Sequence, residues 1–355
     1  MNGAAKRIAI AAGGTAGHVI PALAVADALR AEGAAVTFIG GERAEAQLVP
    51  DAGYPLRTIS VEGLSRGNPL KAARGLARAG RATVAARSLL AELAPHVVMG
   101  GGGYVAGPVG VAALSRRLPL VLTEADSHLG LTNRALAPFA RAVCLSFPIE
   151  GRGGSRYRLT GRPVPPVQAD RGSARAHFGI APQELCVLVF GGSLGSRSVN
   201  QAALSAFSSG AFHVLHVCGR RDYPELSQQP LPAGYDLREY LDVEEFGQAL
   251  AASDLAVARA GGSVFEIAAH GLPAILVPYP HAAADHQSAN ARWMAQAGAA
   301  IVIEDAQLTP ARLARDVAAL LANPNRLAAM ASASARLARP EAAHEIAGTV
   351  MAAAR

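Results

Sequence analysis

Cysteine, aromatic residues and charged residues are all scarce in this sequence. Its 355 residues include three cysteines, an odd number with no CxxC spacing, so neither a disulfide framework nor a zinc site is expected. Aromatic residues make up 5% and charged residues 17%, against 51% hydrophobic residues, which excludes a disordered or fibrous chain. No apolar run approaches the roughly 18 residues of a membrane-spanning helix. The composition is typical of a globular protein from a reducing compartment.

The N-terminal segment also lacks the pattern of a signal peptide. It carries only Lys6 and Arg7 before a short apolar run that Gly13 and Gly14 end, and we interpret this run as a first β-strand. The formal net charge of +6 indicates anionic partners, but it does not distinguish among nucleic acids, lipid headgroups and phosphorylated substrates.

One pattern recurs along the chain: a short β-rich apolar run, then a glycine cluster, then an Ala- and Leu-rich helical stretch. In the first instance the glycines of Gly13–His18 precede a helix expected from about Pro21, because proline suits the first turn of a helix. Strands that alternate with helices predict parallel sheets covered on both faces. The predicted strands are 7–12, 36–39, 96–99, 120–123, 142–146, 185–190, 214–218, 255–258 and 274–277.

Glycine and proline crowd between Ile149 and Pro182, which predicts an inter-domain linker. The length is about twice that of a typical domain. We therefore predict an α/β protein with two doubly wound, Rossmann-like parallel-sheet domains, whose glycine loops face a shared cleft from the carboxyl ends of the strands. The predicted domains are residues 1–163, residues 164–340 and a C-terminal helix, 341–355, that packs back on the first domain.

Glycines between a strand and a helix let backbone N–H groups approach a ligand at the positive end of the helix dipole, which suits a diphosphate. One such loop is weak evidence, but four occupy equivalent positions in the two halves. Neither Gly13–Gly17 nor Gly191–Gly195 has the GxGxxG spacing of dinucleotide-binding enzymes, and the strand at 36–39 is not followed directly by an acidic residue, since Glu42 comes late. The Walker A pattern is also missing, so a dehydrogenase or a P-loop enzyme is disfavoured.

The loops resemble those of the MurG family of N-acetylglucosaminyltransferases of peptidoglycan synthesis. Gly13–Ala24 is similar to the first glycine loop of that family, Gly102–Pro108 to the second and Gly191–Ser196 to the third. Two further stretches, Thr123–Asn133 and Gly271–Gln287, match in family order, so the resemblance covers nearly the whole chain.

This resemblance implies a GT-B fold and an inverting transfer of N-acetylglucosamine from UDP-N-acetylglucosamine to the C4 hydroxyl of the muramyl sugar of undecaprenyl-linked lipid I. The product would be lipid II, used in cell wall biogenesis, cell shape and cell division, and the protein would be peripheral at the cytoplasmic face of the cell membrane. No cofactor and no metal are expected, because no DxD motif occurs and helix N-termini can stabilise the leaving diphosphate.

The resemblance also implies roles for individual residues. Ser193 would bind the donor diphosphate, Glu266 the ribose, Gln287 the donor sugar and the backbone of Leu241 the uracil. Tyr104 and Asn133 match positions on the acceptor side. The full set implied for UDP-N-acetylglucosamine is Thr15, Ala16, Gly17, Asp126, Arg162, Ser193, Leu241, Gly262, Ser263, Glu266 and Gln287.

Two residues are candidates for the base that activates the acceptor hydroxyl. His18 titrates near neutrality and could take the proton, or it could simply pack the loop. Glu124 is the rival base, and a purely hydrogen-bonding role for it is an equal alternative.

Three positions depart from the family pattern. Asp126 replaces an asparagine, and a carboxylate can accept a hydrogen bond but cannot donate one. Pro165 stands where the family has an arginine, so Arg162 is the substitute candidate for a phosphate. The segment Arg259–Glu266 is one residue shorter than the common form.

A basic stretch lies between Glu62 and Glu92, and most of its cations fall on one helical face. Such a helix can bind an anionic membrane, with about 1 kcal/mol from each cation. The alternative is an ordinary solvated face, and a lipid-linked acceptor favours the membrane. Nucleic acid is disfavoured because no aromatic residues interleave with the charges. The cations assigned to the membrane are Arg66, Lys71, Arg74, Arg78 and Arg81.

Three other functions remain open at this stage. One is a GT-B enzyme with a different lipid acceptor, such as diacylglycerol. Another is a catalytically impaired UDP-sugar-binding homologue, and a third is a UDP-N-acetylglucosamine 2-epimerase, which would need no lipid and would leave the basic helix unexplained.

Overall fold

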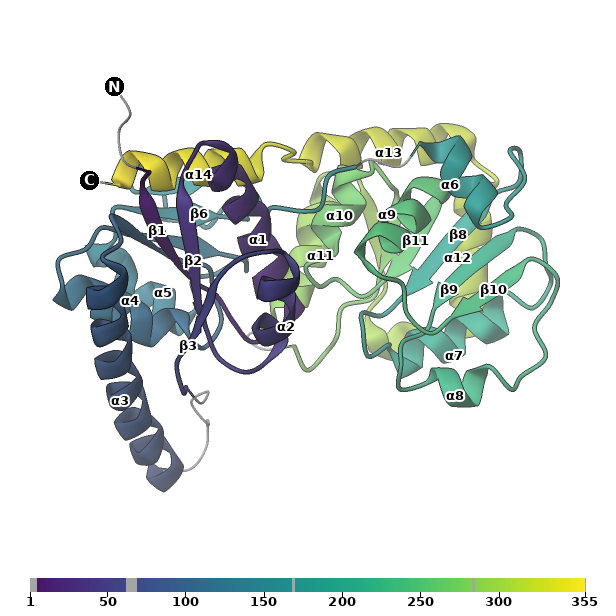
Figure 1. Ribbon diagram of the computed structural model, residues 1–355. Coiled ribbons are helices and arrows are strands. Elements are labelled where there is room, and N and C mark those ends of the chain that lie inside the picture. Colours follow the sequence, from purple (N-terminus) through teal and green to yellow (C-terminus); the bar gives the residue numbers. More distant parts are fainter. Residues whose placement is uncertain (1–4, 62–68, 168–169, 283–284, 355) are drawn as a thin grey trace. The chain divides into compact units, whose positions relative to one another are not determined.

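The computed structural model describes residues 5–61, 69–167, 170–282 and 285–354, and for residues 69–78 it describes the backbone alone. The chain forms two compact units: unit 1 is Met1–Val164 with Arg339–Arg355, and unit 2 is Pro165–Ala338. Each unit has a parallel sheet between layers of helices, as the alternating pattern predicts (Figure 1). The functions assigned to the two domains from the sequence stay predictions.

The described residues of unit 1 form a seven-stranded sheet in the order β3-β2-β1-β4-β5-β6-β7. The order reverses between β1 and β4, and ligands of doubly wound sheets bind at such a switch point. The first and second glycine loops follow these two strands. The strands are β1 (Arg7–Ala11), β2 (Ala35–Gly40), β3 (Leu56–Thr58), β4 (Val97–Gly100), β5 (Leu120–Glu124), β6 (Ala142–Leu145) and β7 (Tyr157–Leu159).

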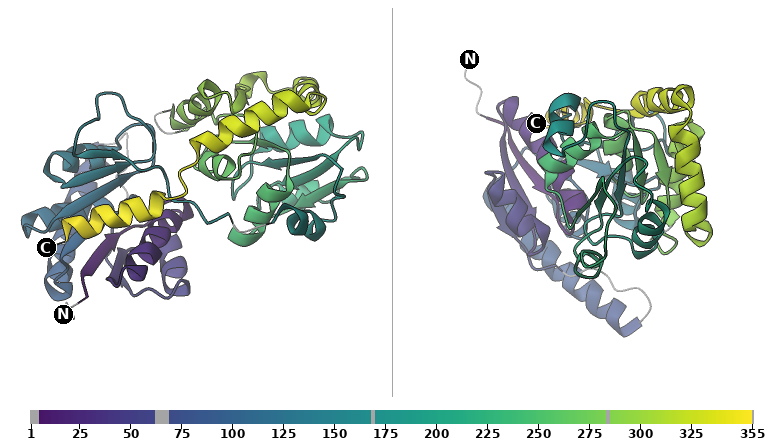
Figure 2. Two further views of the ribbon diagram at one scale, coloured as in Figure 1. Left: turned by 90° about the horizontal axis from the view of Figure 1, so that it is seen from above. Right: turned by 90° about the vertical axis from the view of Figure 1, so that its right-hand side faces the viewer.

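The side chains of β1 alternate between the two faces of the sheet, as a period of two requires. Ile8 and Ile10 pack with α1, α2 and α14, whereas Ala9 and Ala11 pack with α3, α4 and α5. Helix α14 lies beside α1 although the whole of unit 2 separates them in sequence (Figures 1 and 2). The helices are α1 (Ala16–Ala31), α2 (Ala44–Asp51), α3 (Pro69–Leu93), α4 (Ala106–Ser115), α5 (Leu131–Leu136), η1 (Ala137–Phe139) and α14 (Ala342–Ala353).

Unit 2 has a six-stranded sheet among its described residues, in the order β10-β9-β8-β11-β12-β13. The switch point lies between β8 and β11, and the glycine clusters at residues 191–196 and 261–263 follow these strands. The strands are β8 (Cys186–Phe190), β9 (His213–Val217), β10 (Tyr235–Arg238), β11 (Leu255–Ala258), β12 (Ala274–Leu276) and β13 (Ala300–Val302).

Val187 and Val189 of β8 form a core with α7 and α12 on one face of this sheet, and α9 contacts β8. No helix in the described parts of either unit is long and apolar enough to cross a membrane. The helices of unit 2 are α6 (Arg171–His177), α7 (Arg197–Ala206), α8 (Tyr223–Leu226), α9 (Val243–Ala252), α10 (Val264–Ala269), α11 (His286–Gln296), η3 (Asp305–Gln307), α12 (Pro310–Leu321) and α13 (Pro324–Leu337).

Two expectations about local structure are wrong. Helix α1 begins at Ala16 and contains Pro21, which the sequence pattern places in the first turn. The segment from 149 to 182 is not linker throughout, because β7 pairs with β6 and α6 packs against α9.

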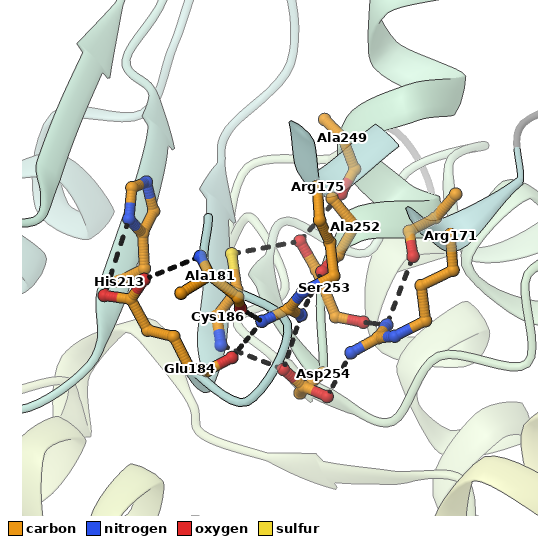
Figure 3. Close-up of polar contacts among 11 residues, drawn as sticks. Arg171, Arg175, Ala181, Glu184, Cys186, His213, Ala249, Ala252, Ser253 and Asp254 are labelled. Atoms are coloured by element: carbon orange, nitrogen blue, oxygen red, sulfur yellow. Dashed lines mark hydrogen bonds and ion pairs between the residues drawn. The ribbon is translucent and has the colours of Figure 1, made fainter. Parts of the chain in front are cut away.

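Helix α6 is fixed to unit 2 by arginines that bind backbone carbonyls (Figure 3). The buried guanidinium of Arg175 donates to the carbonyls of Ala252, Ala181 and Glu184, and Arg171 forms an ion pair of 2.6 Å with Asp254. These carbonyls lie at the C-terminus of α9 and before β8, so the arginines join three segments of the chain.

Candidate active site

The carboxyl edge of the unit 1 sheet brings together the sequence-predicted residues of the first half. A groove of about 530 Å³ is lined by His18, Tyr104, Glu124, Asp126 and Asn133, together with side chains of α3, α4 and α5. A small cavity of about 30 Å³ joins His18 and Glu124 to Gly17 and Arg162. Thr15, Ala16 and Gly17 are exposed at the N-terminus of α1.

His18 lies in the first turn of α1, beside the second glycine loop. Its Nδ1 atom would be 2.8 Å from a Cβ at Gly102, so the ring packs directly on the backbone of that loop. Burial and the nearby positive charge of Arg162 lower the pKa of His18, while Asp126 opposes the shift. The imidazole is therefore neutral near pH 7 and able to accept a proton.

Glu124, at the end of β5, holds the loop that follows it. The carboxylate is buried and accepts hydrogen bonds from Gly130 N at 2.8 Å, Asn133 Nδ2 at 2.9 Å and Asp126 N at 3.1 Å. Burial raises the pKa of Glu124 despite these bonds. The amide nitrogen of Asn133 also donates to Thr123 O, so its donor group is used within the protein.

Arg162 explains how α1 tolerates Pro21. Proline has no N–H to give to the carbonyl four residues earlier, which is that of Gly17. The Nη2 atom of Arg162 donates to that carbonyl instead. The guanidinium thus completes the first turn of α1 next to His18, a tertiary contact that no local sequence signal announces.

Glu45 also belongs to this region and is not among the residues predicted from the sequence. Its carboxylate is fully buried and accepts from Gly14 N, Gly41 N and the hydroxyl of Tyr104. The signal available in the sequence was a glutamate in the first turn of a helix, four residues after Gly41.

In unit 2 the third glycine loop joins β8 to α7. Gly195 has φ +79°, and a Cβ there would be 1.9 Å from Cys218 O, so only glycine fits. Ser193 is exposed in the same loop. Arg259, which was predicted only as part of a shortened segment, donates from Nε to Ser196 Oγ and from Nη2 to Ser198 Oγ, both at 2.8 Å.

The other residues that the resemblance assigns to the donor lie on neighbouring loops of unit 2. Gly262 and Ser263 precede α10, and Glu266 in its first turn lines a groove of about 480 Å³ with Phe246 and His270. Gln287 accepts from Tyr279 N at 3.0 Å, and Leu241 is buried just before α9. No group of three His, Cys, Asp or Glu residues in the described parts of the chain is placed to hold a metal ion.

The structure describes only part of the predicted membrane-binding set. Arg66 lies outside the described residues, and so do the side chains of Lys71, Arg74 and Arg78 on α3. Arg81 is exposed.

Comparisons with known proteins agree with this arrangement. Residues 8–145 match the glycosyltransferase family 28 N-terminal domain, and residues 186–346 match the C-terminal domain of that family. The chain is 45% identical, over 96% of its length and 97% of the relative's, to the UDP-N-acetylglucosamine–N-acetylmuramyl-(pentapeptide) pyrophosphoryl-undecaprenol N-acetylglucosamine transferase of Moorella thermoacetica.

Solved structures show the same fold. The crystal structure of Acinetobacter baumannii MurG superposes with a TM-score of 0.79 at 30% identity, covering 98% of this chain and 99% of that one. The calicheamicin glycosyltransferase CalG4 gives a TM-score of 0.74 at 18% identity, covering 99% and 98%, which shows the fold alone. The prediction of a GT-B glycosyltransferase is confirmed: this chain belongs to glycosyltransferase family 28 and, within it, to the MurG family.

Proposed function

We propose that the protein transfers N-acetylglucosamine from UDP-N-acetylglucosamine to the C4 hydroxyl of the muramyl sugar of lipid I, with inversion, and so makes lipid II. The observation that carries this proposal is the 45% identity with the Moorella enzyme, whose name states both substrates. The match spans 96% of the chain and therefore includes both units.

We assign the donor to unit 2. The exposed Ser193 stands in the loop that leads into α7, where the positive end of the helix dipole favours a diphosphate. We assign the ribose to Glu266, which lines a groove with Phe246 and His270, and the rest of the donor to Leu241, Gly262, Ser263 and Gln287 on adjacent loops. In unit 1, Thr15, Ala16, Gly17, Asp126 and Arg162 are proposed to contact the donor, and Tyr104 and Asn133 to shape the acceptor side.

We assign the proton transfer to His18. As the acceptor C4 oxygen bonds to the anomeric carbon, the hydroxyl proton moves to the imidazole, and the bond from the anomeric carbon to the phosphate oxygen breaks with its electron pair leaving on UDP. A neutral imidazole is needed for this step, and the lowered pKa of His18 supplies it. Glu124 already accepts three hydrogen bonds from its own loop, which supports a positioning role for that carboxylate.

We also propose peripheral membrane contact through the outer part of the unit 1 groove. Three helices that contact in series carry exposed apolar side chains: Val84 of α3 is 66% exposed, Val111 of α4 48% and Leu131 of α5 67%. Val111 and Leu131 line the groove that leads to His18, and Arg81 adds a cation on α3. An apolar rim with an adjacent cation suits an anionic bilayer that holds a prenyl-linked substrate.

The test is a transfer assay with purified protein, UDP-N-acetylglucosamine and a short-chain lipid I analogue. The expected result is acceptor-dependent release of UDP and a disaccharide product. Release of UDP without the acceptor would refute the transfer reaction, conversion of the donor to its C2 epimer with the UDP retained would favour an epimerase, and transfer to diacylglycerol instead of the muramyl substrate would favour the other lipid enzymes. His18→Ala should lower kcat by about 100-fold or more while the Kd for UDP stays within about twofold. Equal losses in both would leave His18 with a structural role.

A further inference from the structure

The carboxylate of Glu45 is enclosed by groups from three separate segments that form the carboxyl edge of unit 1. Its Oε2 atom accepts from Gly14 N at 2.8 Å, in the first glycine loop. Its Oε1 atom accepts from Gly41 N at 2.9 Å, after β2, and from the hydroxyl of Tyr104 at 2.7 Å, in the second glycine loop. The side chain has no exposed surface.

This carboxylate is held in the charged form. Burial by itself would raise the pKa of Glu45, but the hydrogen bonds from Gly14, Tyr104 and Gly41 outweigh burial and leave the pKa below its ordinary value. Burial and the bond to Glu45 raise the pKa of Tyr104 to about 12, so the phenol stays protonated and its hydroxyl donates a hydrogen bond to the carboxylate. Two backbone N–H groups and one hydroxyl thus converge on a carboxylate of the protein itself.

The glycines around Glu45 leave no room for side chains. A Cβ at Gly13 would be 2.7 Å from Glu45 Oε1, and one at Gly40 would be 2.8 Å from its Cγ. A Cβ at Gly41 would be 2.0 Å from the hydroxyl of Tyr104. These glycines are therefore required by the internal carboxylate, and Gly14 N–H is already bonded before any substrate arrives.

The contacts continue from Glu45 to the proposed base. Tyr104 is two residues after Gly102, and the backbone of Gly102 packs on the ring of His18. A shift of the second glycine loop would therefore move the surface that holds the imidazole. We propose that Glu45 is a positioning residue, an internal anion that holds the two glycine loops in the arrangement in which His18 meets the acceptor. This inference rests on the proposed transfer reaction.

Glu45→Gln tests the charge without changing the size of the side chain. An amide has one accepting oxygen, so its NH2 group would face either Gly14 N–H or the Gly41 and Tyr104 donors. The loss of a hydrogen bond to a charged acceptor predicts a drop of about 10- to 100-fold in kcat/KM for the lipid I analogue. The Kd for UDP, measured by calorimetry, should stay within about twofold.

Glu42→Gln is the matched control, because Glu42 is exposed in the same loop and the substitution removes the same charge. It should leave both constants within about twofold of the wild type. Tyr104→Phe removes one of the three donors and should lower kcat/KM for the acceptor in the same direction as Glu45→Gln.

Chemical rescue separates an internal anion from a general loss of stability. Glu45→Ala leaves a space with three converging donors, and added formate should restore acceptor turnover with saturation, while formate should not raise the activity of wild type or of Glu42→Gln. Acceptor kcat/KM of Glu45→Gln within twofold of the control, or no gain of Glu45→Ala with formate, would overturn the proposal. A wild-type protein without transfer activity would instead refute the proposed function.

Discussion

Replacement of Arg175 by methionine should destabilise unit 2 more than any surface substitution near it. The side chain of Arg175 is 5% exposed, and its guanidinium donates to Ala252 O at 2.9 Å, to Ala181 O at 2.7 Å and to Glu184 O (Figure 3). Methionine keeps most of the apolar stem but removes the guanidinium donor from all three carbonyls, of which, among the described residues, only Ala181 O keeps another bond, from Glu184 N.

The magnitude follows from the number of bonds lost. Each hydrogen bond from a charged donor contributes about 1.5 to 3 kcal/mol. The substitution also removes the free-energy cost of burying a charge, which offsets part of this loss, so the net cost is about 3 to 5 kcal/mol. Asp254 keeps its partners Arg171 and Cys186 N, so no buried carboxylate is left unpaired. A loss of this size is a large part of the about 5 to 15 kcal/mol by which a domain is stable.

Urea unfolding followed by tryptophan fluorescence measures this loss in the free energy of unfolding of unit 2. Trp293 is the only tryptophan of the sequence and lies in unit 2, where its ring is 5.2 Å from that of Phe265. Arg171→Met is the control: that side chain is 48% exposed, and its loss should cost about 1 kcal/mol or less. A free energy of unfolding of Arg175→Met within about 1 kcal/mol of the wild type, or an equal loss in the two variants, would refute the role given to the Arg175 guanidinium.

The charges near His18 predict opposite shifts of its pKa in two variants. Arg162→Gln removes a nearby positive charge and should move the acid limb of kcat/KM to higher pH. Asp126→Asn removes a negative charge and should move that limb to lower pH. Rate profiles from about pH 5 to 8 check both, and shifts in the same direction would contradict the assignment of His18 as base. Gly195→Ala forces a Cβ to 1.9 Å from Cys218 O and should weaken UDP binding, measured by calorimetry, by about tenfold or more; an unchanged Kd would remove this loop from the donor site. Transfer should continue at the wild-type rate in EDTA, and a loss that Mg²⁺ restores would show that helix N-termini do not suffice for the leaving group.

The sequence was a good guide wherever one segment determines its own structure. The buried strands on either side of each switch point are continuous apolar runs followed by glycines, so both the strands and the loops could be located. Short strands at or near the sheet edges, such as Leu56–Thr58 and Tyr157–Leu159, were missed, because three residues carry too little pattern.

The rest depends on contacts between distant segments. The start of α1 was misplaced because Pro21 usually marks a first turn, and the guanidinium that replaces its missing hydrogen bond is 145 residues away from Gly17. Glu45 was missed for the same reason: a glutamate near a helix start is normally solvated, and only the folded chain brings Gly14 and Tyr104 to it. The glycine loops could thus be located from the sequence, but the residues that hold these loops in place could not.

The place of α14 in the chain has a consequence for synthesis on the ribosome. Ile346, Ala347 and Val350 belong to the same core as Val19 and Leu29, but they are translated only after the whole of unit 2. Unit 2 is continuous and can fold as it emerges, whereas the α1 face of unit 1 must wait with exposed apolar surface until α14 arrives. Nascent unit 1 is therefore the part of this enzyme on which we expect a chaperone to act.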